Sequence, residues 1–213
     1  MKKYLFPTAL LIASVIFLVL FVVSGKSGTN DDYLISPWKD KVSVTINQSD
    51  KYFTIVNKSD KNLLRQGGVN ISGWSVRTEK RTLLPIPQGT FLFRQGIVNP
   101  LQDIVLEPGE KAIIVSDQSP IGVSFKINKC SPKLERYQVF SPKISDDSEI
   151  EGENIFYNDC VEKYSNDFDF FKLEWRVYLD SESEEGRILL LDDEKRLVAS
   201  LIKHSKKSNA AGD

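Results

Sequence analysis

The stretch Val69-Asn70-Ile71-Ser72-Gly73-Trp74-Ser75-Val76 decides the fold, because it alternates apolar and polar side chains around one glycine and one tryptophan. On an extended strand, Val69, Ile71 and Gly73 share one face, and Trp74 lies on the other. A glycine inside a strand marks a bulge or the close approach of another backbone. A tryptophan in such a pattern is usually a core anchor. We therefore predict a strand over 70–74 in a small β-sandwich.

Short apolar runs separated by turn residues continue along the chain. They predict strands over 42–48, 52–57, 90–93, 103–106, 111–116, 122–128, 173–179, 187–191 and 196–202. Segment 82–87 carries two prolines, which lack ladder donors, so we expect it at a sheet edge. Pro108 and Gly109 suit the two central positions of a type II turn. Many short strands punctuated by turns predict an all-β sandwich or barrel.

Residues 131–170 differ from the rest, because segment 141–154 is acidic and has few large apolar side chains. We interpret 131–170 as a surface excursion with a short helix within 158–169. Cys130 and Cys160 are expected to pair and pin this excursion, and closing a loop of about 30 residues contributes roughly 3–4 kcal/mol. The alternative, a reactive thiol pair, lacks the Cys-x-x-Cys spacing. The polar segment 204–213 is predicted to be a disordered tail.

The N-terminus contains an uncharged run from Tyr4 to Val23. A membrane-spanning helix needs about 20 apolar residues, whereas the apolar core of a secretory signal is shorter. We predict a cytoplasmic stub and transmembrane anchor over 1–25, a stalk over 26–40 and a β-domain over 41–203. Lys2 and Lys3 place the N-terminus in the cytoplasm and the body outside. The alternative is a signal peptide cleaved near Val23-Ser24-Gly25, which would release a secreted body.

Composition argues against several functional classes. The formal net charge of −1 does not suggest a nucleic-acid-binding surface. The single histidine, His204, lies in the polar tail, so a Ser-His-Asp or Cys-His arrangement is not expected, and we predict neither an enzyme nor a bound cofactor. Calcium is the one metal left open, through Asp146, Asp147 and Glu149, with Glu151 or Asp167 and Asp169 as further oxygen donors. The Asp-x-Asp-x-Asp-Gly loop of an EF-hand is absent.

The chain resembles the lamin tail domain family over about residues 41–128. The resemblance is carried by Phe53-Thr-Ile-Val-Asn57, Asn70-Ile71-Ser-Gly73-Trp74, Pro85, Pro87 and Gly89, and Ile104-Val-Leu-Glu-Pro108-Gly109-Glu110. It implies a compact immunoglobulin-like β-sandwich. Segments 119–130, 156–160 and 175–179 also resemble an extension found in short, membrane-anchored bacterial members. Bacterial members are often attached to exported or membrane-bound proteins and are thought to tether or bind. No coiled-coil rod precedes the domain, so filament assembly is not expected.

These observations together predict a membrane-tethered, extracytoplasmic, non-catalytic binding module. Its contacts would be the membrane, through Tyr4–Val23, and an unknown protein or glycan at the cell surface or in the envelope. Sheet edges and loops would carry the binding. The alternative is a structural or assembly component that associates with itself.

Overall fold

The fold was analysed in a computed structural model of the 213-residue chain. It describes residues 33–47, 52–60, 68–79, 82–144, 150, 154–179 and 186–203. The chain divides into two units, Met1–Tyr33 and Leu34–Asp213, and the described helices and strands all belong to the second. No helix among the described residues is long and apolar enough to cross a membrane. The predicted anchor at Tyr4–Val23 and the predicted tail at 204–213 lie outside the described residues.

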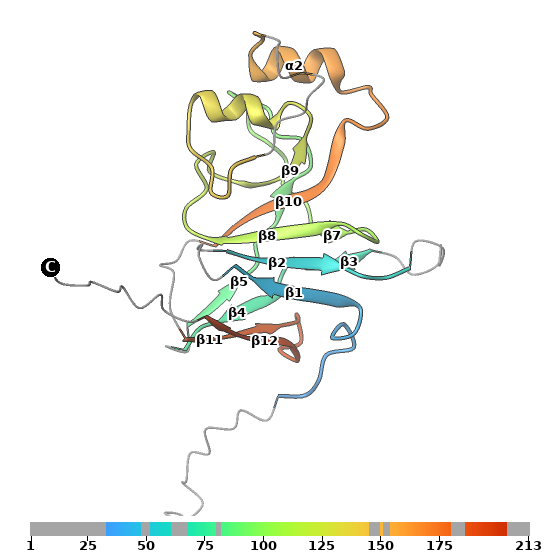
Figure 1. The fold of residues 1–213 in the computed structure, drawn as a ribbon, viewed down its shortest axis with the longest axis vertical. Coiled ribbons are helices and arrows are strands. Elements are labelled where there is room, and N and C mark those ends of the chain that lie inside the picture. The colour runs from blue at the N-terminus through green and yellow to red at the C-terminus, as the bar shows by residue number, and fades with distance from the viewer. Residues whose placement is uncertain are drawn as a thin grey trace, which may run out of the picture. The chain divides into compact units, whose positions relative to one another are not determined.

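The described part is mostly β-structure, in agreement with the predicted all-β class, and its largest sheet has six strands in the order β1-β2-β8-β10-β9-β6. These strands are β1 (Val42–Ile46), β2 (Tyr52–Asn57), β6 (Gly89–Thr90), β8 (Lys111–Ser116), β9 (Ser124–Asn128) and β10 (Phe171–Leu179). The pairs β8–β10 and β6–β9 are parallel and the other pairs antiparallel. In Figure 1 the sheet rises from β1 through β2, β8 and β10 to β9.

A four-stranded antiparallel sheet runs in the order β12-β11-β4-β5. Its strands are β4 (Ser75–Arg77), β5 (Leu83–Pro85), β11 (Gly186–Leu191) and β12 (Leu197–Lys203). The proline-bearing β5 is an edge strand, as predicted, and β11 and β12 form the expected C-terminal hairpin. A third, two-stranded sheet pairs β3 (Val69–Asn70) with β7 (Val105–Leu106).

The six-stranded sheet buries apolar side chains on both of its faces. Along β8, Ala112 and Ile114 enter a core shared with the four-stranded sheet, whereas Ile113 and Val115 enter a second core on the other side. A strand buried on both faces has no need of polar alternation. This explains the uninterrupted apolar run of β8.

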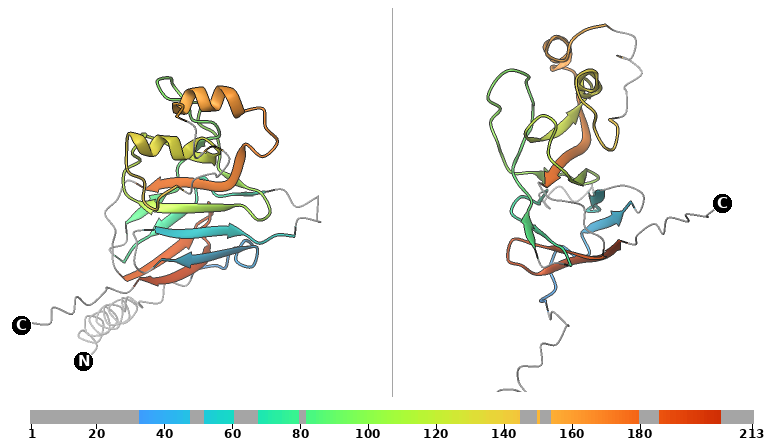
Figure 2. Two further views of the ribbon diagram at one scale, coloured as in Figure 1. Left: turned by 45° about the horizontal axis from the view of Figure 1, so that its top comes forward. Right: turned by 90° about the vertical axis from the view of Figure 1, so that its left-hand side faces the viewer.

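The second core is built largely from residues 131–170, which the sequence had suggested to be a surface excursion. They contain a 3-10 helix, η1 (Ser131–Arg136), and a helix, α2 (Tyr157–Tyr164), which lie side by side in Figure 2. Cys130 and Cys160 form a disulfide, with Cα atoms 5.8 Å apart, consistent with the expected pairing. Seven apolar residues of this segment are buried in the same core: Leu134, Phe140, Ile144, Ile150, Tyr157, Val161 and Phe170. They are spaced so widely in the sequence that no periodic pattern reveals them.

The predicted strand over 70–74 was wrong, because the strand ends at Asn70 and the chain turns. The Trp74 N–H donates to the Ile71 carbonyl at 3.2 Å, and Gly73 takes a φ of +81°, which favours glycine. The turn places both Ile71 and Trp74 in the first core, where each is 1% exposed or less. Strict alternation would have sent them to opposite faces. Trp74 is nevertheless the core anchor that was expected.

The predicted turn at Pro108-Gly109 is present. Gly109 has a φ of +86°, and the Glu110 N–H donates to the Glu107 carbonyl at 2.8 Å. The Asn57 side chain donates to the Leu106 carbonyl at 2.7 Å, and the Asn57 carbonyl accepts from the Gly109 N–H at 2.8 Å. These hydrogen bonds therefore hold the turn, which precedes β8, against the end of β2. The strand before the turn, β7, pairs with β3.

Candidate functional site

A pocket of about 400 Å³ opens at one end of the six-stranded sheet. The parallel strands β8 and β10 finish at this end, and β9 and β6 begin there, so four strands contribute to one rim. We call it the Tyr178 pocket. It is lined by Pro87, Gln88, Leu101, Asp117, Gln118, Ser119, Gly122, Val123, Ser124 and Tyr178. Its volume lies within the range of about 300–1,000 Å³ that is typical of small-ligand sites.

Tyr178 is one of two buried polar residues in the lining of the pocket, and Ser124 is the other. Its side chain lies on the face of β10 opposite Val177 and Leu179, and the residue is 7% exposed. Among the described residues, its hydroxyl has no hydrogen-bond partner. Burial raises the pKa of Tyr178 to about 12, opposed by nearby Arg176 and assisted by Asp117. The hydroxyl therefore stays neutral at physiological pH, and it can both donate and accept a hydrogen bond.

The loop between β8 and β9 forms the polar rim and is held by its own hydrogen bonds. The Asp117 carboxylate accepts from the Gln118 N–H at 2.9 Å, and the Ser119 hydroxyl donates to the Val123 carbonyl at 2.7 Å. Ser124 Oγ accepts from the Tyr178 N–H at 3.1 Å, which ties the start of β9 to β10. These contacts preorganise the rim, so a ligand need not order it on binding.

The 70–74 stretch supports one residue of the pocket lining, Gln88, through Asp103. The Asn70 amide donates to Asp103 Oδ2 at 2.9 Å, and Gln88, which lines the pocket, donates to Asp103 Oδ1 at 2.8 Å. These two bonds, from Gln88 first and Asn70 second, lower the pKa of Asp103. Asn70, predicted only as part of a fold signature, thus helps to position a residue of the pocket wall.

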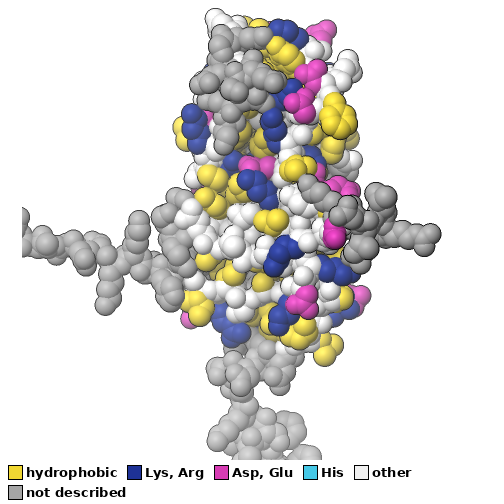
Figure 3. All heavy atoms as spheres, turned by 45° about the vertical axis from the view of Figure 1, so that its right-hand side comes forward, with side chains coloured by type: hydrophobic (Ala, Val, Ile, Leu, Met, Phe, Trp, Pro, Cys, Tyr) yellow, Lys and Arg dark blue, Asp and Glu magenta, His cyan; other side chains and the backbone are white. Residues whose placement is uncertain are grey.

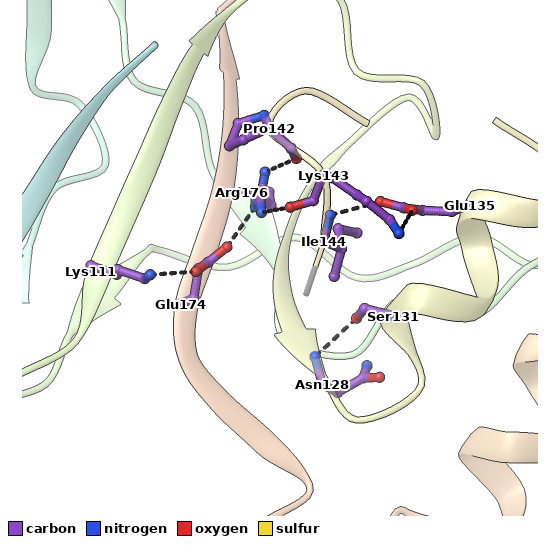
Figure 4. Close-up of polar contacts among 9 residues, drawn as sticks. All are labelled: Lys111, Asn128, Ser131, Glu135, Pro142, Lys143, Ile144, Glu174 and Arg176. Carbon is purple, nitrogen blue, oxygen red and sulfur yellow. Dashed lines mark hydrogen bonds and ion pairs between the residues drawn. The ribbon is translucent and has the colours of Figure 1, made fainter. Parts of the chain in front are cut away.

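A buried guanidinium lies two residues before Tyr178, on the same face of β10. Arg176 has a side chain that is 3% exposed, and its Nε lies 2.7 Å from Glu174 Oε1. Its two terminal nitrogens donate to the carbonyls of Pro142 and Lys143 at 2.5 and 3.2 Å, as Figure 4 shows. Arg176 therefore fastens the segment after η1 to the strand that carries Tyr178.

A second buried charge pair, Glu110 with Lys126, lies on the other face of the sheet. The two side chains are only 5% and 7% exposed, and the ammonium lies 5.3 Å from the centre of the Phe91 ring and 5.6 Å from that of Trp175. Lys126 belongs to β9 and Glu110 precedes β8, so the pair links the Pro-Gly turn to the sheet. Because aromatic rings enclose it, we assign it a structural role.

The calcium candidates Asp146, Asp147 and Glu149 lie outside the described residues, as does Glu151. Asp169 and Asp167 are described, and both approach the Lys129 ammonium, at 2.6 and 3.3 Å, where the sequence had suggested a cation. Within the part of the chain that the structure describes, no three acidic, histidine or cysteine side chains gather as metal ligands would. His204 also lies outside that part.

Sequence reasoning missed the Tyr178 pocket. Asp117, Gln118 and Ser119 look like an ordinary turn, and Tyr178 sits in an apolar run that resembles core. The one available signal is Arg176, a charge inside that run, which indicates that alternate residues of β10 face a different environment.

The hydrophobic side chains on the face drawn in Figure 3 are dispersed among basic and acidic ones. The exposed apolar residues Ile97 and Val98, 59% and 95% exposed, lie in the loop after β6. Asn99 holds this loop by accepting from the Arg94 N–H at 2.6 Å, and Asn158 of α2 accepts from the Gln95 N–H at 3.1 Å. The loop tip is therefore a second feature that a partner can contact.

Comparison of the chain with known protein families, curated proteins and solved structures finds no match.

Proposed function

We propose that the chain is a membrane-tethered, extracytoplasmic, non-catalytic binding module for a cell-surface or envelope partner, and that the Tyr178 pocket is its binding site. The observation that carries the proposal is a preformed pocket of about 400 Å³ whose polar rim is held by its own hydrogen bonds. Because the rim is already ordered, a ligand that binds there loses less conformational entropy than one that must order a mobile loop.

The lining residues favour binding over catalysis. The Ser119 hydroxyl donates to a backbone carbonyl and accepts from the Ile121 N–H at 3.3 Å, and Ser124 Oγ accepts from a backbone N–H. A serine nucleophile requires a neighbouring base that takes its proton. Ser119 instead directs its proton to the backbone and so supports the loop.

The extracytoplasmic location rests on two features. Cys130 and Cys160 are joined in a disulfide and are both 0% exposed, at the centre of the second core. Disulfides persist in oxidising compartments outside the cytoplasm. The predicted anchor at Tyr4–Val23 would place the body there and hold it at the membrane.

We also propose that the first core is an immunoglobulin-like β-sandwich of lamin tail type. Support comes from the packing of one face of the six-stranded sheet on the four-stranded sheet, with Trp74 between them, and from the bonds of Asn57 to the Pro108-Gly109 turn. The parallel pair β8–β10 departs from an immunoglobulin sandwich, whose sheets are antiparallel. β10 follows η1 and α2, so this pair belongs to the C-terminal extension, whereas a second parallel pair, β6–β9, lies within the lamin-like region and is a departure of its own.

Self-association in the envelope is the second candidate. The observation that favours it is the loop tip, where Ile97 and Val98 are exposed on a loop held at both Asn99 and Asn158. A rigid apolar projection loses little conformational entropy when it enters a groove of a second copy.

Site-specific photo-crosslinking in living cells tests both candidates. A photoreactive residue replaces Leu101 at the pocket rim, Val98 at the loop tip, or Val139, an 89% exposed control outside the pocket. The proposal expects a defined heterologous product from position 101 and none from 139. A product containing only a second copy, formed from position 98, supports assembly instead. A partner captured equally from 101 and 139, or none at all, contradicts the pocket as the site.

A further inference from the structure

We propose that the Tyr178 pocket receives a cationic side chain, a lysine or an arginine, from a partner protein. This inference rests on the proposed function, because it takes the pocket as the binding site and identifies the chemical group that enters it. It is carried by three properties of the lining, which are its charge, its hydrogen-bond acceptors and its apolar walls.

The one charged residue in the lining of the pocket is an acid, Asp117. Among the described residues, its carboxylate forms no ion pair and accepts a hydrogen bond only from a backbone N–H. Arg176, two residues before Tyr178, lies outside the lining, and its guanidinium is bonded to Glu174 at 2.7 Å. A cation that enters the pocket is therefore attracted by Asp117, whereas an anion is repelled.

Polar side chains of the lining retain oxygen atoms that can accept a hydrogen bond. Asp117 receives the Gln118 N–H through Oδ1 at 2.9 Å, which leaves Oδ2 for a ligand. The Gln88 amide nitrogen donates to Asp103 at 2.8 Å, so the amide oxygen of Gln88 remains as an acceptor. The Ser119 hydroxyl, in contrast, donates its proton to a backbone carbonyl. Ammonium and guanidinium groups carry only donors, which match these acceptors.

The apolar walls suit the aliphatic stem that lysine and arginine share. Leu101, Val123 and Pro87 line the pocket, and Leu101 is 54% exposed, so a stem that packs on it removes apolar surface from water. Both side chains bury their methylene groups on apolar surface while the charged end stays hydrated. Asp117 is itself exposed, so the charged end can pair with it and keep part of its water.

The test uses the full chain in nanodiscs of zwitterionic lipid, with empty nanodiscs as background. Capped lysine and capped arginine, each as the N-acetyl N-methylamide, are titrated by saturation-transfer NMR. Capped norleucine and capped citrulline are the matched probes, because they keep the stem and lack the charge. We expect at least one cationic probe to bind, and to bind at least threefold more tightly than its neutral match.

Two aspartate variants locate the binding. Asp117→Asn keeps the size and one oxygen of the side chain but removes the charge, and it should weaken the cationic probes about 3- to 10-fold, an effect between those of an exposed ion pair and a charged hydrogen bond. Asp159→Asn, at an exposed position of α2 outside the pocket, should leave the affinity unchanged. The inference is overturned if no cationic probe binds, if the neutral probes bind as tightly, or if Asp117→Asn weakens binding no more than Asp159→Asn.

Crosslinking from Leu101 in cells that carry these variants separates this inference from the proposed function. A heterologous partner captured from Leu101, with no binding of the cationic probes, leaves the proposed function standing and rejects the cationic side chain. Probe binding without any captured partner has the opposite meaning. Loss of the crosslinked product in Asp117→Asn, with the product retained in Asp159→Asn, supports both.

Discussion

Removing one member of the buried Glu110–Lys126 pair is expected to destabilise the fold strongly. The two side chains are 5% and 7% exposed, so neither charge is solvated when its partner is lost. Breaking such a pair costs about 3–5 kcal/mol, because a buried charge remains uncompensated. Lys126→Met keeps the aliphatic stem against Phe91 and Trp175, and Glu110→Gln keeps an acceptor for the Glu107 N–H.

The double variant measures the coupling between the two residues. If the single costs were additive, Glu110→Gln with Lys126→Met would lose about 6–10 kcal/mol. With both charges removed, the pair and its contacts to the two aromatic rings are lost but no uncompensated charge remains, so we expect about 1–3 kcal/mol. The coupling free energy is therefore at least about 3 kcal/mol.

Denaturant unfolding followed by tryptophan fluorescence provides the assay, since Trp175 lies beside the pair. The matched control is Lys111→Met, which removes an ion pair of 2.7 Å to Glu174 from a lysine side chain that is 44% exposed. Exposed pairs contribute about 0–1 kcal/mol. The reasoning is refuted if the double variant loses as much unfolding free energy as the two single variants together. It is also refuted if Lys126→Met loses no more than Lys111→Met.

Three further predictions concern the fold. Replacing Cys130 and Cys160 by serine should cost about 3.6 kcal/mol in the chain-entropy model for a separation of 30 residues, and it should expose η1 and α2 to proteolysis before the β-sheets. Gly109→Ala should cost about 1–2 kcal/mol in thermal unfolding, because its φ of +86° strains any residue with a Cβ; a neutral result would argue against the turn. For Asp192, burial raises the pKa, but hydrogen bonds from Arg196 and Ser36 outweigh it and hold the pKa below its usual value. A carboxyl with a depressed folded pKa stabilises the protein above its unfolded pKa of about 3.9 and loses this contribution as the pH falls through the folded value. Asp192→Asn should therefore reduce the loss of stability that occurs below about pH 4. If the free energy of unfolding falls with pH as steeply in the variant as in the unmodified chain, this carboxyl does not cause that loss.

Most strands and turns could be predicted from the sequence, because they depend on the apolar pattern and backbone preferences of a few neighbouring residues. The strands β1, β2, β8, β10, β11 and β12 lie where alternating or continuous apolar runs predicted them. The Pro108-Gly109 turn and the edge position of β5 follow from the backbone restrictions of proline and glycine.

Features that depend on distant contacts could not be predicted in the same way. The turn at Ile71–Trp74 has the polarity pattern of a strand, and only the packing of Trp74 in the first core shows that the chain bends there. The second core gathers Leu134, Phe140 and Tyr157 against β8 and β9 across long polar intervals. The Tyr178 pocket combines the ends of four strands, whose order in the sheet is not a property of any single segment.

Hydrogen–deuterium exchange of the full chain in nanodiscs, with and without solubilised envelope material, tests most directly whether the Tyr178 pocket is the binding site. The account predicts slower exchange over residues 117–124, which form the rim, and little change in β5 at the edge of the four-stranded sheet. Protection confined to the loop tip at Ile97 and Val98, with residues 117–124 unchanged, would contradict it.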